Sequence, residues 1–184
     1  MGLAMLRTPE FHYSLLLKDV ILEDSLVPVI SKKPLVEMAI HYLPEKKIKS
    51  YMWVQDPDRK DLPLWEYALP YPQSLQVLVR FALNKLSLSE IYSFYTTFDK
   101  LPLLHEALKY PQSFKILLGV MERFDSKQIY RLFAMKDAYN NTLLYHAVSQ
   151  PDLLPYLLDF LRELPRSDVV ELLTLRNGWT DRSS

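Results

Sequence analysis

Four histidines are the residues of this sequence best suited to acid–base chemistry: His12, His41, His105 and His146. An imidazole titrates near neutral pH, so it can act as a general base, a general acid or a metal ligand. No two of them have the spacing of the zinc-binding H-E-x-x-H motif. Glu106 follows His105, but adjacent helical residues point about 100° apart and cannot easily share one substrate atom. The spacing therefore favours structural histidines, and no metal site is predicted.

Other signatures of catalysis or cofactor binding are missing from the sequence. The chain has no cysteine, which excludes disulfides, thiolate-bound metals and thiol nucleophiles. Its three glycines are far apart, whereas phosphate-binding loops need clustered glycines. No serine stands in a G-x-S-x-G turn. We therefore expect a non-catalytic protein without a cofactor. The alternative is a hydrolase or transferase that uses His105 or His146 with a nearby carboxylate.

Charge argues against a nucleic-acid partner. The chain carries 22 basic and 22 acidic side chains, so it lacks the basic excess of nucleic-acid-binding proteins. Its one basic cluster is Lys46, Lys47 and Lys49, with Tyr51 and Trp53 close behind, and such a combination can bind RNA or phosphate. Because acidic residues flank the cluster on both sides, a solvated helix face is the favoured interpretation.

The bulk composition is that of a cytosolic globular protein. Hydrophobic residues make up 49% of the chain and charged residues 24%, which is enough for a substantial core. The longest apolar runs, 13–17 and 153–158, fall far short of the roughly 20 residues that a membrane span needs. The first seven residues are too short for a signal peptide. We expect a cytoplasmic protein with no membrane span, and the oligomeric state stays open.

An internal repeat must supply the elements that position these side chains. Residues 62–75 (LPLWEYALPYPQSL) and 101–114 (LPLLHEALKYPQSF) are identical at nine of fourteen positions, at an offset of 39. Residues 141–154 form a third copy 40 residues further on, and 34–40 (PLVEMAI) form a degenerate copy that aligns with 63–69. Repeats of this period are typical of solenoids built from stacked supersecondary units.

Each complete copy predicts three helices. The first is short and ends near a proline that starts the second: Pro72, Pro111 or Pro151. The second has apolar residues at i, i+3, i+4 and i+7. These stripes are Leu75, Leu78, Val79 and Ala82; Phe114, Leu117, Leu118 and Met121; and Leu154, Leu157, Leu158 and Leu161. The third is predicted to open with a serine, Ser87, Ser126 or Ser167, and residues 87–90 fit a capping box.

No such unit can cover its own apolar stripe, so neighbouring units must stack. We therefore predict an all-α fold, a short α-solenoid with three helices per unit and a period of about 39–40 residues. A helical-hairpin array of the HEAT type is the competing fold. The predicted boundaries, within one continuous domain, are an N-terminal helical cap at 1–33 and repeats over 34–184, divided into 34–61, 62–100, 101–140 and 141–184.

One segment of the repeat resembles the motif of a known repeat family. Residues 137–147 (DAYNNTLLYHA) resemble the ankyrin pattern D-x-x-G-N-T-x-L-H-x-A, and 101–107 (LPLLHEA) resemble the same element with His105 on the motif histidine. Asn140 stands where the motif has glycine, and asparagine is the next-best residue for a left-handed turn. With the longer period and the added third helix, residues 33–184 resemble the ankyrin-type repeats of intracellular bacterial effectors, notably the Legionella type.

This resemblance implies a binding surface. In ankyrin-like stacks the residue before the motif alanine faces a concave groove where partners bind, while the motif histidine hydrogen-bonds neighbouring turns. The residues expected to bind a partner are Met38, Tyr67, Glu106, Lys109, Tyr139 and His146. Local packing of these side chains between short helices is the alternative.

The resemblance also implies a setting. The partner would be a host protein or another effector, and the chain would be a secreted bacterial effector, or an adaptor that regulates one, in the host-cell cytosol. Residues 177–180 (NGWT) resemble the turn into another repeat. A further alternative is therefore that the chain is the binding domain of a longer enzyme.

Overall fold

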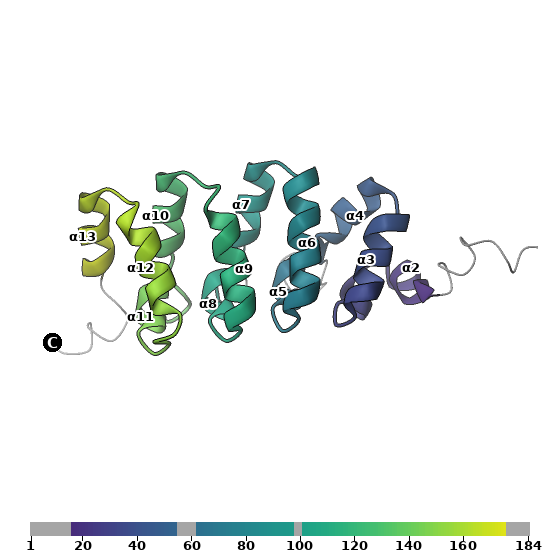
Figure 1. Ribbon diagram of the computed structural model, residues 1–184, viewed down its shortest axis with the longest axis horizontal. Helices are drawn as coiled ribbons and strands as arrows, with labels where there is room; N and C mark the ends of the chain where they lie inside the picture. The colour runs from purple at the N-terminus through teal and green to yellow at the C-terminus, as the bar shows by residue number, and fades with distance from the viewer. Residues whose placement is uncertain (1–15, 55–61, 98–100, 176–184) are drawn as a thin grey trace, which may run out of the picture. The chain divides into compact units, whose positions relative to one another are not determined.

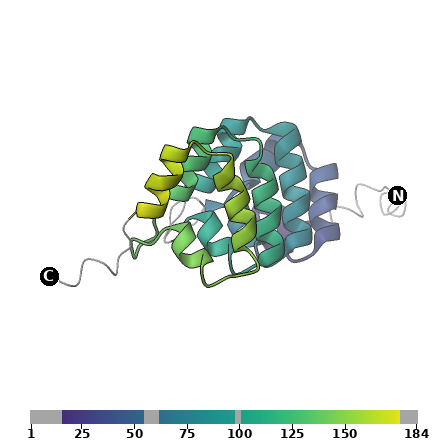
Figure 2. The same ribbon diagram turned by 60° about the vertical axis from the view of Figure 1, so that its left-hand side comes forward.

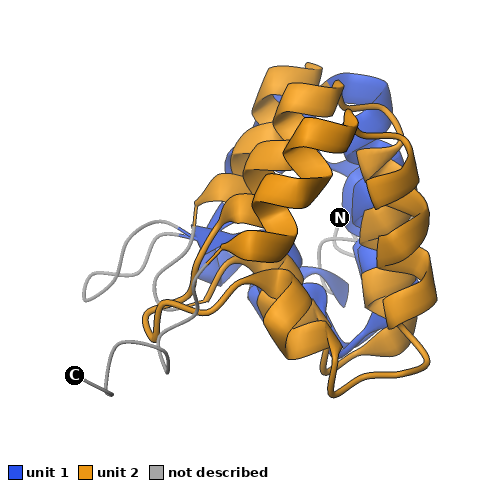
Figure 3. Cartoon of the chain, turned by 90° about the vertical axis from the view of Figure 1, so that its left-hand side faces the viewer, with its two compact units in different colours: residues 1–85 blue, residues 86–184 orange. Residues whose placement is uncertain are grey.

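The computed structural model describes residues 16–54, 62–97 and 101–175. These residues are mostly helical: they form the α-helices α2 to α13, one short 3-10 helix and a two-stranded sheet (Figure 1). The predicted all-α class is confirmed. The chain divides into two compact units, Met1–Lys85 and Leu86–Ser184, coloured separately in Figure 3. The boundaries predicted for the cap and the repeats stay predictions. His12 and the segment 177–180 lie outside the described residues.

Unit 1 contains the first part of the helical chain. Its elements are α2 (Lys18–Glu23), the 3-10 helix η2 (Val27–Val29), α3 (Lys33–Tyr42), α4 (Glu45–Tyr51), β1 (Trp53–Val54), β2 (Leu62–Pro63), α5 (Leu64–Ala68) and α6 (Pro72–Lys85). Helix α3 packs against α4 and α6, and α5 packs against β2 and α6. The two strands are antiparallel, with Trp53 opposite Pro63.

The degenerate copy of the repeat, residues 34–40, does not form the short first helix that its alignment with 63–69 predicts. Residues 34–40 belong to the ten-residue helix α3, which packs against the fourteen-residue α6. The five-residue α5, with which the sequence aligned this segment, is much shorter. The reason is local: Pro34 lies in the first turn of α3, as Pro72 starts α6, and no further proline interrupts the helix before Pro44.

Unit 2 repeats one three-helix pattern. Its helices are α7 (Leu88–Thr96), α8 (Leu103–Ala107), α9 (Pro111–Met121), α10 (Ser126–Ala134), α11 (Leu143–Ala147), α12 (Leu154–Arg162) and α13 (Arg166–Thr174). We call α8–α10 the 103–134 triplet and α11–α13 the 143–174 triplet. Equivalent helices are neighbours, since α8 packs against α11 and α10 against α13 (Figure 2). Between α9 and α12, the Lys115 ammonium lies 4.4 Å from the centre of the Tyr156 ring.

Helices α7, α10 and α13 begin at different kinds of cap. At α7 the predicted serine cap is confirmed, because Ser87 Oγ accepts the Glu90 N–H (3.2 Å) and the Glu90 carboxylate accepts the Ser87 N–H (2.7 Å). Helix α10 opens with Ser126, as predicted. Asp125 is the cap, and it exchanges the same two hydrogen bonds with Gln128.

The serine predicted at the start of α13 is also not a cap. Ser167 lies inside the helix, and Pro165 precedes it as the N-cap residue without a side-chain hydrogen bond. Asp125 and Pro165 share one property: each stands ahead of the serine and already favours a helix start. A carboxylate accepts the free N–H groups of the first turn, and proline fixes its own φ in advance. Helix α13 therefore opens at Arg166, one residue before the predicted Ser167.

The second helices bury the predicted core residues. Leu78, Leu117 and Leu157 are each 0% exposed, as predicted. In unit 2, Tyr95 of α7 is also buried, and its hydroxyl donates a 2.8 Å hydrogen bond to the Leu117 carbonyl oxygen of α9. The stripe predicted for α12 holds only in part, because Leu158 is 40% exposed.

Among the described residues, no helix is both long enough and apolar enough to cross a membrane.

Candidate functional site

A rigid turn joins α10 to α11, and the carboxylate of Asp137 organises it. Asp137 Oδ1 accepts the backbone N–H groups of Tyr139 (2.8 Å) and Asn141 (2.9 Å). The Asp137 N–H in turn donates to the Asn141 carbonyl oxygen at 3.0 Å. Asn140 has a φ of 65°, the left-handed conformation expected from an asparagine at the motif glycine. These bonds fix the backbone of the turn.

The second oxygen of Asp137 ties this turn to helix α11. Asp137 Oδ2 lies 2.7 Å from Nε2 of His146. Burial raises the pKa of Asp137, but hydrogen bonds from the Asn141 N–H, His146 and the Tyr139 N–H outweigh it, so this pKa lies below its usual value. The carboxylate is therefore ionised at neutral pH and can only accept. Nε2 of His146 must carry the hydrogen, and its ring is held in one orientation.

His105, on α8, has the opposite environment. Its ring packs edge-on against that of His146, with 5.6 Å between the ring centres. It is 5% exposed, and both of its ring nitrogens are enclosed by protein, with the backbone of Asn141 as their polar neighbour. Its pKa falls to about 4, first because burial disfavours the imidazolium and second because His146 lies beside it. The backbone of Asn141 and the carboxylate of Asp137 oppose this shift without cancelling it.

His105 is therefore a neutral ring whose two nitrogens are enclosed by protein. The ankyrin resemblance implied a hydrogen bond from His105 to a neighbouring turn, and the backbone of Asn141, in the turn between α10 and α11, is the polar group that its ring meets. His146 bonds the Asp137 carboxylate of the same turn. The enclosed nitrogens also cannot exchange a proton with a substrate from solution. The bond between His146 and Asp137 was not predicted, although Asp137 stands nine residues before His146 in the sequence.

A small hollow lies between α8 and α11. Its volume is about 230 Å³, and its lining residues are Leu101, His105, Leu108, Lys109, His146, Ser149 and Gln150. At its rim, the Lys109 ammonium binds both carboxylate oxygens of Glu106 at 2.8 Å. The hollow is smaller than the roughly 300–1,000 Å³ of small-molecule pockets. It has room for one side chain of a partner.

Four of the six predicted binding residues therefore come together in unit 2. Lys109 and His146 line the hollow, Glu106 holds Lys109, and Tyr139 stands at the tip of the Asp137 turn with 77% of its surface exposed. We call Lys109, Tyr139 and His146 the turn–hollow surface. The other two predicted residues belong to unit 1, where Tyr67 on α5 and Met38 on α3 are both half-buried.

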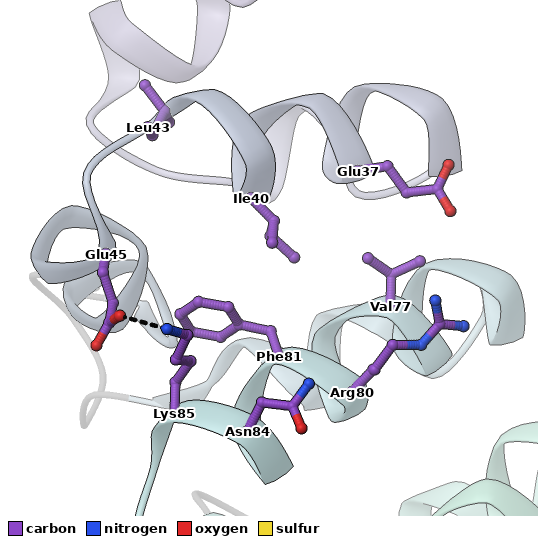
Figure 4. A pocket seen from close by; sticks show the side chains of 9 residues that line it. All are labelled: Glu37, Ile40, Leu43, Glu45, Val77, Arg80, Phe81, Asn84 and Lys85. Atoms are coloured by element: carbon purple, nitrogen blue, oxygen red, sulfur yellow. Dashed lines mark ion pairs between the residues drawn. The ribbon is translucent and has the colours of Figure 1, made fainter.

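Unit 1 has a hollow of its own, which sequence reasoning missed. It lies between α3 and α6, has a volume of about 370 Å³, and is shown in Figure 4. Ile40, Val77 and Phe81 form its apolar part, while Lys85 and Glu45 at one end form an ion pair of 2.8 Å. The available signal was that Val77 and Phe81 are four residues apart on α6, which makes a second apolar stripe beside the first.

The basic cluster of unit 1 is largely neutralised. Lys47 pairs with Asp24 at 2.9 Å, and Lys49 pairs with Glu45 at 3.0 Å. Two of the three lysines that could have met a phosphate therefore already have carboxylate partners. This arrangement agrees with a solvated helix face and weakens the argument for RNA binding.

Comparison with known proteins gives no assignment. The chain matches no protein-family model, and neither the curated proteins nor the solved structures include a significant match to it. Across the part of the chain that the structure describes, no three histidine, aspartate or glutamate side chains gather as metal ligands.

Proposed function

We propose that this chain is a non-catalytic protein-binding module that holds a partner protein on its turn–hollow surface. The observation that carries the proposal is Tyr139, an aromatic side chain that is 77% exposed on a turn whose backbone Asp137 fixes. Exposed aromatic residues on a rigid backbone offer a large contact area at a small cost in entropy, and they are frequent hot spots of protein interfaces.

The surroundings of Tyr139 support this proposal. The same Asp137 carboxylate bonds the backbone of Tyr139 and the ring of His146, so the aromatic tip and the edge of the hollow are held by one group. Lys109 adds a mostly exposed ammonium group at the rim. A partner could place one side chain in the hollow and pack a second against Tyr139.

The proposed architecture is an ankyrin-like α-solenoid. Support comes from unit 2, where equivalent helices of successive triplets are neighbours, and from the left-handed Asn140 in the turn before α11. The proposed setting, a secreted bacterial effector or an effector-regulating adaptor in the host-cell cytosol, rests on the resemblance of residues 137–147 alone.

Site-specific photocrosslinking tests the proposal. A photoreactive phenylalanine replaces Tyr139, and the chain is irradiated in host-cell cytosolic extract. The matched control carries the same group in place of Leu22, which is 79% exposed in unit 1. We expect a discrete adduct from position 139 and none from position 22. Equal labelling at both positions, or no labelling at position 139, would contradict the proposal.

The hydrolase or transferase alternative keeps one supporting observation. An aspartate that holds a histidine at 2.7 Å beside a hollow is an arrangement that can orient a general base. Of the two histidines named for this role, only His146 has the required geometry, because the nitrogens of His105 are enclosed.

Esterase activity separates the two functions. The wild-type chain, His146→Ala and His41→Ala are compared on an activated ester, with His41 as an exposed histidine on α3. The protein-binding proposal expects the same low rate for all three chains. A rate that falls only in a folded His146→Ala variant would favour the enzyme.

A further inference from the structure

The hollow of unit 1 has the size of a small-molecule site (Figure 4). Its volume of about 370 Å³ falls within the roughly 300–1,000 Å³ of such pockets, whereas the hollow between α8 and α11 is smaller. Its middle part is apolar, because Ile40 of α3 points toward Val77 of α6 and Phe81 lies one turn further along α6. We call Ile40, Val77 and Phe81 the apolar floor, and it suits the apolar body of a ligand.

One end of the hollow is bridged by an ion pair. Lys85, the last residue of α6, pairs with Glu45, the first residue of α4, at 2.8 Å (Figure 4). The pair therefore joins two helices across this end. A partner helix lying along the hollow would run into it, whereas a compact ligand would fit between the ion pair and the opposite end.

The opposite end carries one acidic and one basic side chain, Glu37 of α3 and Arg80 of α6 (Figure 4). Arg80 is exposed and forms no ion pair with another described residue. Glu37 uses Oε1 to pair with Lys33, one turn earlier on α3, at 3.4 Å, and a carboxylate accepts from more than one donor. Asn84, one turn after Arg80, adds an exposed side-chain amide.

These polar groups match the head group of an α-amino acid, which carries a carboxylate and an ammonium on one carbon atom. A guanidinium such as that of Arg80 binds a carboxylate through two parallel hydrogen bonds, and the Asn84 amide can donate to the same group. Glu37 can accept the ammonium. Packed helices lie about 8–10 Å apart, so a head group placed between α3 and α6 can contact side chains of both.

We propose that the hollow of unit 1 binds a free apolar α-amino acid. Its head group lies between Glu37 and Arg80, and its side chain covers the apolar floor toward the Lys85–Glu45 pair. A simple carboxylate would leave Glu37 as an unmatched like charge, and a doubly charged phosphate would be repelled more strongly. This site belongs to unit 1 and does not depend on the partner proposed for the turn–hollow surface of unit 2.

Titration with single amino acids tests the proposal. L-leucine, L-methionine and L-phenylalanine are each added to the whole chain, with L-serine as the polar control, and methyl NMR signals of Ile40 and Val77 report binding in the hollow. We expect saturable shifts of these signals with at least one of the three apolar amino acids and none with L-serine. No saturation with any of the three in the millimolar range overturns the proposal.

Two analogues of the best ligand test its head group. The amide lacks the carboxylate and mimics the first residue of a protein, whereas the N-acetyl form lacks the ammonium and mimics the last residue. Each should bind at least about tenfold more weakly than the free amino acid, because each loses one charged hydrogen-bonding group. If either analogue binds as well as the free amino acid, the occupant is not a free amino acid.

Side-chain variants then locate the head group. Arg80→Met and Glu37→Gln each remove one charge from an exposed position, and the matched control is Arg123→Met, at an exposed arginine after α9. Circular dichroism checks that all three chains fold. We expect the dissociation constant to rise at least about tenfold for Arg80→Met and Glu37→Gln and to stay unchanged for the control. Wild-type affinity in either of the two variants places the head group elsewhere and overturns the proposal.

Discussion

The 103–134 and 143–174 triplets of unit 2 are built from corresponding helices, but their polar side chains stand at different positions. In α8, His105 is buried and neutral, with the Asn141 backbone as its polar neighbour. In α11 the corresponding position is Tyr145, and the next residue, His146, bonds an ionised carboxylate. In the 143–174 triplet, these hydrogen bonds are concentrated where the Asp137 turn lies beside α11.

The two triplets differ more in the burial of equivalent apolar side chains than in their hydrogen bonds. We expect Leu118→Ala to lower the free energy of unfolding by about 2–5 kcal/mol, because it leaves a cavity in the core. Leu158→Ala, at the equivalent exposed position, should cost under about 1 kcal/mol. Both are measured by urea denaturation of the single variants beside the wild-type chain. Equal losses would mean that the two triplets are packed alike.

Removing the carboxylate should damage only the turn of the second triplet. Asp137→Ala leaves the N–H groups of Tyr139 and Asn141 and the ring of His146 without their acceptor, which should cost about 2–3 kcal/mol of unfolding free energy. Asp137→Asn keeps an oxygen for the backbone and should lose less. Urea denaturation gives the stability, and amide exchange at Tyr139 and Asn141 locates the change. Unchanged exchange at both amides would show that the carboxylate is not what fixes the turn.

The neutral His105 predicts a pH dependence. The unfolded chain binds a proton at a pKa near 6.5, whereas the folded pKa is about 4, so stability is complete above pH 6.5 and falls as the pH drops toward 4. Between pH 7 and pH 5 the loss should be about 2 kcal/mol. In His105→Phe this part of the loss should disappear, while exposed His41→Ala should retain it. Parallel pH profiles for wild type and His105→Phe would refute the assignment.

The smallest expected effect on folding is that of Tyr139→Ala. Its side chain is 77% exposed, so the free energy of unfolding should change by under about 0.5 kcal/mol. Binding of the partner identified by crosslinking should weaken by about 2 kcal/mol or more if this residue is a hot spot. Isothermal calorimetry measures the binding loss, and Tyr156→Ala, an exposed tyrosine on α12, is the control.

Sequence pattern was sufficient for the helical class, the period and the buried residues Leu78, Leu117 and Leu157. These follow from local spacing, since an i, i+3, i+4, i+7 stripe forms one helical face whatever lies next to it. The exposure of Leu158 did not follow, because its spacing equals that of Leu118 and only the neighbouring elements distinguish them.

The candidate site was predictable only in part, for a similar reason. Tyr139, Lys109 and His146 could be named from the resemblance, but the bond between His146 and Asp137 could not. Which of the two rings reaches Asp137 depends on how the turn between α10 and α11 lies over α8 and α11. The place of α3 was missed because a seven-residue match between 34–40 and 63–69 says nothing about how far a helix continues.

The buried phenol of Tyr95 gives unit 2 a natural optical reporter. Burial raises the pKa of Tyr95 well above its usual value, and its hydroxyl is committed to the Leu117 carbonyl oxygen. In a rapid jump to alkaline pH, exposed tyrosines form tyrosinate at once, whereas Tyr95 must wait until α7 separates from α9. The slow phase of ultraviolet absorbance therefore times the opening of this unit without any added label, and Tyr95→Phe should abolish it.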